Sequence, residues 1–154
     1  MSERSHKRMT RLPAAPGAES WTGPVLVRGY LRVREPWRHP IAAMRMLAKW
    51  RRLKHDVEHG PGFLSFEYWL RSESLLFGMH VAWSSHAELL AFYRTPSHHE
   101  AAAFSMRSPF VRAMKFRTLG LDTNDRMIEL GGFVICTEES DLAPDSLFPA
   151  PPTS

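Results

Sequence analysis

The chain has 154 residues, of which 44% are hydrophobic and 23% charged, values typical of one globular domain. No apolar run approaches about 18 residues, which excludes a transmembrane helix, and the charged N-terminus lacks the apolar stretch of a secretory signal. The single cysteine, Cys136, excludes an internal disulfide framework and any multi-cysteine metal site. Together these features favour a cytoplasmic protein.

The formal net charge of +4 raises the question of nucleic-acid binding. Much of the positive charge lies near the N-terminus and in residues 45–54, where Arg45, Lys49 and Arg52 recur at helical spacing. That spacing is typical of a solvated helix face, and no basic row alternates with aromatic residues. We therefore expect neither nucleic acid nor a membrane as partner.

Both ends of the chain read as tails. Residues 1–23 are polar and punctuated by proline and glycine, and residues 137–154 are acidic and rich in proline. We expect both segments to be disordered, which leaves residues 24–136 as the folded domain.

The first two predicted elements are a strand and a helix. Residues 25–34 alternate, with Val25 and Val27 on one face and Arg28 and Tyr30 on the other, which predicts a strand. Residues 41–58 carry apolar side chains spaced by three and four, which predicts an amphipathic helix.

A β-hairpin follows, because the apolar runs 62–70 and 75–84 are joined by four polar residues. A symmetric turn pairs Leu70 with Leu75 and places Glu67 and His80 on one face. The other face then carries the larger apolar set: Leu64, Phe66, Tyr68, Phe77, Met79, Val81 and Trp83.

Capping-box patterns at residues 85–88 and 97–100 predict helix starts on either side of Pro96. Residues 108–120 open with Ser-Pro, which predicts a short helical piece that ends at a glycine. Residues 127–136 read as the last strand, with a bulge at its glycine pair.

The predicted order strand–helix–strand–strand–helix–strand is that of an α+β, ferredoxin-like fold with an antiparallel sheet. Its helices cover one face of the sheet. The other face carries Tyr30, Trp69 and Leu76 beside charged residues, too apolar a surface to leave in water. We therefore expect a homodimer with sheet against sheet, a dimeric α/β barrel.

Short motifs within this topology resemble the antibiotic-biosynthesis-monooxygenase-like, dimeric α/β-barrel superfamily. They are Pro61-Gly62-Phe63-Leu64, Val81-Ala82-Trp83-Ser84 and Thr95-Pro96-Ser97-His98-His99. Residues 34–37 and 69–71 look similar to an uncharacterised monooxygenase-like branch. The resemblance covers about residues 24–136.

The resemblance implies a cavity between the sheet and the helices. Members include cofactor-free oxygenases of polycyclic phenols and quinones, haem-degrading and haem-dependent enzymes, and proteins of no known activity. Trp83 matches a tryptophan of the cofactor-free oxygenases, but Met79, Leu89 and Ala103 stand where these have asparagine, tyrosine and arginine. The residues of the haem degraders are also absent.

The expected function is a cofactor-independent, monooxygenase-like protein for a small apolar molecule, aromatic or polyketide-like, with no metal. The side chains expected to line the substrate pocket are Phe66, Phe77, Met79, Trp83 and Phe92. The proton acceptors expected from the residues are Tyr68, His98 and His99.

Each of these assignments has an alternative. Trp83 also suits a plain core position, and His98 and His99 also suit an exposed helix start. One of these histidines could instead be the axial ligand of a haem. A third class is a non-catalytic ligand-binding or structural module, whose mark is a filled core between sheet and helices.

Overall fold

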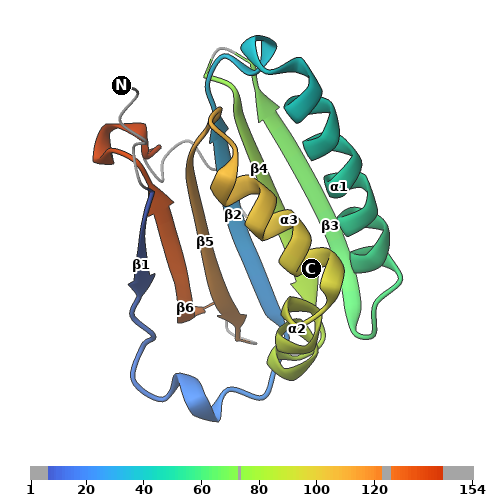
Figure 1. Ribbon diagram of the computed structural model, residues 1–154. Coiled ribbons are helices and arrows are strands. Elements are labelled where there is room, and N and C mark those ends of the chain that lie inside the picture. Colours follow the sequence, from blue (N-terminus) through green and yellow to red (C-terminus); the bar gives the residue numbers. More distant parts are fainter. Residues whose placement is uncertain (1–6, 73, 123–125, 144–154) are drawn as a thin grey trace.

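The computed structural model describes residues 7–72, 74–122 and 126–143. It forms one antiparallel sheet in the order β1-β6-β5-β2-β4-β3, with helices on one face (Figure 1). The strands are β1 (Arg8–Leu12), β2 (Val25–Val33), β3 (Phe63–Arg71), β4 (Leu76–Trp83), β5 (Val111–Leu121) and β6 (Met127–Cys136). The α-helices are α1 (Pro40–Glu58), α2 (His86–Tyr93) and α3 (Pro96–Arg107), and the 3-10 turns are η1 (Ala18–Ser20), η2 (Pro36–Arg38) and η3 (Glu139–Asp141).

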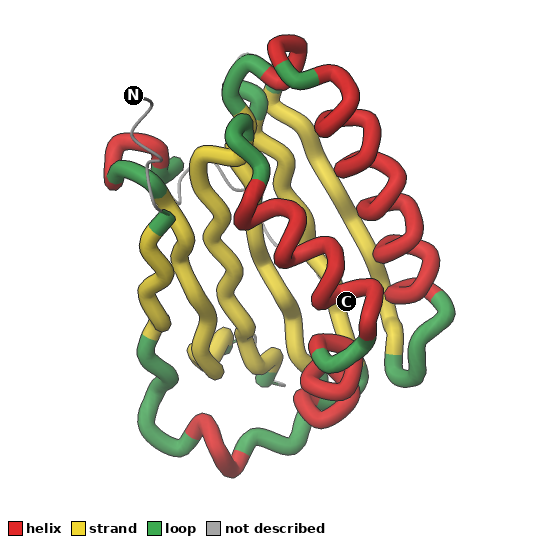
Figure 2. The backbone as a smooth tube through the Cα atoms, in the orientation of Figure 1, coloured by secondary structure: helices red, strands yellow, loops and turns green. Residues whose placement is uncertain are grey.

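The central four strands, β5-β2-β4-β3, together with the helices confirm the predicted α+β, ferredoxin-like class. The helices gather over the β2–β4–β3 side of the sheet (Figure 2). We call the face that they cover the helix face and the opposite one the second face. None of the described helices is long and apolar enough to span a membrane.

The fourth strand of this core is not the predicted one. Residues 108–120, expected to be helical, contain β5, which lies between β2 and β6. Ser108 ends α3 instead of starting a helix, since its hydroxyl donates to the Phe104 carbonyl at 2.8 Å. A strand flanked on both sides buries residues of both faces, so β5 lacks the clean alternation that marks a half-exposed strand.

Part of the expected N-terminal tail is also ordered. Residues 8–12 form β1, which pairs with β6 from Arg8 opposite Cys136 to Leu12 opposite Gly132. An edge strand is held mainly by backbone hydrogen bonds, so its polar side chains gave no signal in the sequence.

The C-terminal segment departs from the expected disorder as well. Residues 139–141 form η3 and Ala143 is buried. The remaining parts of the two expected tails, residues 1–6 and 144–154, lie outside the described residues.

From Ser65 on, the hairpin has the predicted faces in a register shifted by two residues. A register break between Phe63 and Ser65 places Phe63, not the predicted Leu64, against Trp83. Leu70 pairs with Phe77 and Glu67 with His80. Leu75, expected to open the second strand, has a left-handed backbone (φ 47°) and belongs to the turn. Because side chains alternate with a period of two, a two-residue shift keeps each one on its face. Met79 therefore lies on the helix face and His80 on the second face, as predicted.

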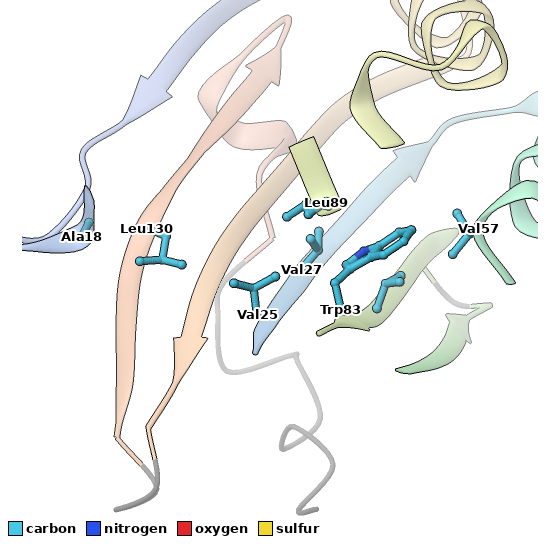
Figure 3. Packing of buried hydrophobic residues seen from close by; sticks show 8 residues of the cluster. Ala18, Val25, Val27, Val57, Trp83, Leu89 and Leu130 are labelled. Atoms are coloured by element: carbon cyan, nitrogen blue, oxygen red, sulfur yellow. The ribbon is translucent and has the colours of Figure 1, made fainter. Parts of the chain in front are cut away.

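The core of the helix face has two clusters of buried side chains. The first surrounds Trp83 and includes Val27, Val57, Val81 and Leu89. Figure 3 shows the indole of Trp83 between Val27 and Val57. The second lies nearer the start of α1 and includes Leu31, Met46 and Phe110. The first cluster adjoins the candidate functional site.

Candidate functional site

Four rings meet where α2 passes into α3, and we call Trp83, Phe92, Tyr93 and His98 the α2 aromatic cluster. The Phe92 ring lies 5.2 Å from Trp83 and 5.5 Å from His98, between ring centroids. The Tyr93 and His98 centroids are 4.8 Å apart. Strand, helix and following helix thus each contribute to one aromatic group.

The local sequence explains why these rings meet. Ser85 caps α2 directly after β4, since its hydroxyl accepts from the Glu88 backbone N–H at 3.2 Å. Pro96 suits the first turn of a helix and starts α3 after only two linking residues. The first turn of α3 therefore packs back against the last turn of α2, which brings His98 against Tyr93.

Tyr93 is the buried phenol of the cluster. Its side chain keeps some exposure, but its hydroxyl hydrogen-bonds Thr118 of β5 in the interior. Burial raises the pKa of Tyr93 to about 12, against a smaller opposite effect of the Thr118 hydrogen bond. The phenol is therefore neutral at neutral pH and can donate a proton.

His98 is shifted toward its neutral form. Burial lowers the pKa of His98, and nearby His99 lowers it further, while a hydrogen bond with the Tyr93 backbone carbonyl acts in the opposite direction. The ring nitrogen facing that carbonyl donates its N–H, so the other nitrogen of the neutral ring carries a lone pair. The rings of a neutral phenol and a neutral imidazole thus lie side by side, with the Tyr93 hydroxyl on Thr118.

The structure brings some of the predicted site residues together. Phe66, Met79 and Phe92 all pack against the Trp83 core cluster, and His98 contacts Phe92. Trp83 itself is 1% exposed, so its ring is part of the core.

Three other predicted residues lie apart from this group. Phe77 belongs to the second core cluster, edge-on to Trp50 at 5.8 Å. Tyr68 is on the edge strand β3 and is 74% exposed, and His99 is exposed on α3.

Sequence reasoning missed Tyr93 and Thr118. Tyr93 looked like one more apolar residue of a short helix, and Thr118 lay in a segment expected to be helical. The only local signal was the Pro96 break between Tyr93 and His98, which indicates two helices folded back on each other.

Two hollows are described, and both adjoin His39 at the start of α1. One of about 360 Å³ is lined by apolar groups that include Ile41 and Phe104. The other, of about 230 Å³, is lined by Arg34, Arg112 and further polar residues. Trp83 lies near the other end of α1, in one buried cluster with Val57.

Haem does not fit the side chains around His98. Its ring is enclosed by Phe92 and Tyr93 with centroids within 5.5 Å, which leaves no planar slot against the imidazole. The ring planes of His98 and His99 differ by 80°, so the two imidazoles are not oriented to bind one planar ligand together. Among the described residues no group of three or more His, Cys, Asp or Glu could hold a metal ion.

A second charged group lies on the second face. His80 is 1% exposed and stands in register between Arg28 of β2 and Glu67 of β3. Burial lowers the pKa of His80, Arg28 lowers it further, and Glu67 acts in the opposite direction. This row is a cross-strand polar cluster of a guanidinium, a buried imidazole and a carboxylate.

Comparison with solved structures identifies the fold. A Caulobacter crescentus protein named as a candidate antibiotic biosynthesis monooxygenase superposes with a TM-score of 0.54 at 18% identity, over 69% of this chain and 97% of its own. A protein of the same description from Nitrosomonas europaea superposes with a TM-score of 0.52 at 12% identity, over 64% of this chain and 90% of its own. A Mycobacterium tuberculosis protein superposes with a TM-score of 0.51 at 16% identity, over 62% of this chain and 92% of its own.

No family model matches the sequence, and no curated protein matches it either. At such low identities the structural likeness shows the fold alone. That fold is the one implied by the sequence motifs, and this expectation is confirmed.

Proposed function

We propose that the chain is a small cofactor-independent oxygenase that acts on an electron-rich aromatic or polyketide-like molecule, with His98 as proton acceptor and Tyr93 as proton donor. The observation that carries the proposal is the contact between a neutral imidazole and a neutral phenol whose pKa values are displaced in opposite directions. Such displaced pairs are how proteins assign acid and base roles near neutral pH.

The chemistry requires only these groups and molecular oxygen. His98 removes a proton from a ring carbon activated by a phenol or its keto form, which leaves a carbanion. The carbanion gives its electrons to oxygen, and the resulting peroxide takes a proton from Tyr93. Loss of water then leaves a carbonyl on that carbon, so one oxygen atom enters the product and the other leaves as water. The imidazolium of His98 restores the proton to Tyr93.

The aromatic side chains supply orientation and a dry environment. Phe92 lies against His98 and holds the orientation of the imidazole ring. Trp83, Phe66 and Met79 support Phe92 from the core. Both His98 and Tyr93 keep some exposure at the corner between α2 and α3, and this corner is the side from which we propose that the substrate approaches.

The decisive measurement is oxygen uptake by the purified chain with anthrones, naphthols and hydroquinones. We expect uptake with at least one of them, and a loss of about 100-fold or more in His98→Gln, the usual range for a general base. Because burial lowers the His98 pKa, kcat/KM should rise with pH through a value below 6.5 and then level off.

The matched control is His99→Gln, which changes the exposed neighbour and should keep the wild-type rate. Tyr93→Phe keeps the ring and removes the proton donor, so we expect kcat to fall while KM changes little. No uptake across the panel, or equal rates in wild type and His98→Gln, would refute the proposal.

A second candidate is a non-catalytic binding or structural module. It is favoured by the packing around Trp83, which is 1% exposed, with Val57 and Leu89 in the same cluster. Under this alternative the chain consumes no oxygen with any aromatic compound of the panel.

A further inference from the structure

The start of α1 adjoins two hollows that the proposed oxygen chemistry does not use. His39 lines both of them, at the end of α1 away from the α2 aromatic cluster. The start of α1, the end of α3 and the start of β5 lie at this same end of the sheet (Figure 1). A ligand bound here is therefore separate from the substrate of the proposed oxygenase.

The smaller hollow, of about 230 Å³, carries an excess of positive charge. Its lining includes three arginines and one carboxylate, which are Arg34, Arg38, Arg112 and Glu35. Asp141, which lies 3.3 Å from Arg112, is a second acid against these three arginines. One guanidinium charge thus stays unbalanced, and the guanidinium is the side chain that best matches a carboxylate or phosphate.

These arginines also keep hydrogen-bond donors to spare. Arg34 has no ion pair with any described residue, and the pair of Arg38 with Glu35 at 3.4 Å is exposed and therefore weak. Arg112 contacts Asp141, but its Nε is buried without a hydrogen-bond partner in the described part of the chain. Because a buried donor without an acceptor costs free energy, an oxyanion in the hollow would be stabilised by it.

The backbone is bent so that these side chains meet. Glu35 has a left-handed conformation (φ 49°, ψ 51°), which is unfavourable for a residue other than glycine. It turns the chain from β2 into η2, which brings Arg34 and Arg38 to one hollow. Backbone strain of this kind clusters at binding sites and switches.

The start of α1 adds to the positive potential. Its first turn holds no acidic residue, and His39, its N-cap, makes no side-chain capping hydrogen bond to the described chain. The partial positive charge of this helix end therefore adds to that of the arginines. The charge of Arg112 also affects Lys7, whose pKa is lowered to about 8 by burial and then by Arg112.

The larger hollow, of about 360 Å³, offers an apolar surface next to these charges. Its lining consists of Pro40, Ile41, Ala42 and Phe104 together with His39 and Arg45. Ile41 is 69% exposed, so an apolar group placed against it would remove that surface from water. Pockets for small molecules combine such an apolar lining with a few polar groups.

We propose that the start of α1 binds an amphiphilic organic anion, with its carboxylate or phosphate on the arginines and its apolar body against Ile41 and Phe104. Arg34 and Arg112 donate to the oxyanion. A small inorganic anion would leave the apolar hollow in water, and a neutral aromatic molecule would leave the guanidinium donors without an acceptor. Tight binding therefore requires both parts of the ligand.

Calorimetric titration of the full chain with 2-naphthoate at low salt tests this requirement. We expect 2-naphthoate and 2-naphthyl phosphate to bind, and added salt to weaken both. Acetate lacks the apolar body and 2-naphthalenemethanol lacks the charge, so each should bind about tenfold more weakly or worse. Equal binding of the neutral alcohol and 2-naphthoate, or no binding of either naphthyl anion, would overturn the proposal.

Two pairs of variants locate the charged part of the site. Arg34→Gln should weaken 2-naphthoate binding about tenfold, the usual effect of a lost hydrogen bond to a charged group. Arg51→Gln, which removes the same charge from the exposed side of α1 outside both hollows, is the control and should bind as wild type. Equal losses in both variants would show a general charge effect and contradict the site.

Glu35→Gln should act in the opposite direction. It removes the carboxylate that competes with the ligand for Arg38, so 2-naphthoate should bind several-fold more tightly. Glu100→Gln makes the same change of charge beside Lys49 and Arg52, away from the hollows, and should leave the affinity unchanged. Weaker binding to Glu35→Gln than to wild type would contradict the role given to the arginines.

The apolar part and the separation from the oxygenase site need their own variants. Ile41→Ala should weaken 2-naphthoate binding several-fold, whereas Met44→Ala, equally exposed on α1 but outside the hollow, should not. His98→Gln should bind 2-naphthoate as wild type. Binding lost in His98→Gln and kept in Arg34→Gln would place the probe in the α2 aromatic cluster and refute a site at the start of α1.

Discussion

A buried histidine, His80, and a half-buried one, His98, lie on opposite faces of the sheet and share one electrostatic property. Burial is the largest cause that lowers the pKa of both His80 and His98. Glu67 counteracts the shift of His80, and the Tyr93 carbonyl counteracts that of His98, but neither interaction cancels the burial. Burial thus favours the neutral form of both imidazoles. A proton acceptor must be neutral, whereas an ion cluster does not require a neutral imidazole.

The pH dependence of stability follows from these shifts. The unfolded chain takes up protons on its histidines near pH 6.5, whereas the folded chain takes them up on His80 and His98 only at lower pH. Below pH 6.5 the unfolded state therefore holds more protons, and the free energy of unfolding falls as the pH falls.

Urea unfolding between pH 7.5 and 5 checks this expectation. His80→Gln and His98→Gln should each flatten the dependence, and Ser140→Ala on the exposed η3, which removes no titratable group, should leave it unchanged. If the free energy of unfolding depends on pH in the same way in all four proteins, the lowered pKa values of His80 and His98 are contradicted.

At the scale of elements, the two predicted capping boxes had different outcomes. Ser85 caps α2 as predicted, and both Ser84 and Ser85 donate to the Glu88 carboxylate. Gly62 has a positive φ of 81°, and a Cβ there would overlap that carboxylate, so the approach of the loop requires glycine.

The second box, at residues 97–100, is wrong. Pro96 has the backbone angle of a first helical residue, so α3 begins there with Thr95 as its N-cap. Ser97 lies one residue inside the helix, where it is 6% exposed and hydrogen-bonds Asp56 of α1. The same residue pattern thus serves as a cap in α2 and as an interhelical contact in α3.

Ser85→Ala removes the cap and should lower the free energy of unfolding by about 1 kcal/mol, the usual value for a lost N-cap. Chemical denaturation followed by circular dichroism measures it, and Ser140→Ala on exposed η3 serves as the control. Equal losses of unfolding free energy in both variants would mean that the Ser85 cap stabilises the fold no more than an exposed serine does.

The whole molecule is a ferredoxin-like core extended at one edge by β6 and β1. Lys7 ties this extension to the helix layer, because its ammonium group donates to the backbone carbonyls of Ser105, Met106 and Ser108 at 3.3, 2.8 and 2.7 Å. These carbonyls end α3, where a positive charge is favourable. Burial and then nearby Arg112 lower the pKa of Lys7 to about 8.

Lys7→Gln should therefore loosen the extension without disturbing the core. Hydrogen exchange should speed up in β1 and at the end of α3, with little change in β2 and β4. The control is Arg8→Gln, which changes the exposed residue next to Lys7 in the chain. A uniform change across all strands would show that Lys7 supports the whole fold, and no change would show that β1 is held by backbone pairing alone.

The sequence by itself determined the elements with a regular hydrophobic period. The strand near residues 25–34, the helix near 41–58 and the hairpin faces from Ser65 on are correct, because side-chain periodicity is a local property. The two-residue register shift does not change it, whereas the break between Phe63 and Ser65 does. The motifs around Trp83 and His98 also pointed to the correct fold.

Only the tertiary structure decided the rest, because those features depend on contacts between segments far apart in the chain. β5 is a strand because β2 and β6 flank it, and β1 is ordered because β6 offers it a partner. Tyr93 becomes a buried acid only when Thr118 and His98 close around it. In the same way, Ala143 is buried only because Tyr30, 113 residues earlier, presents a hydroxyl acceptor on the second face.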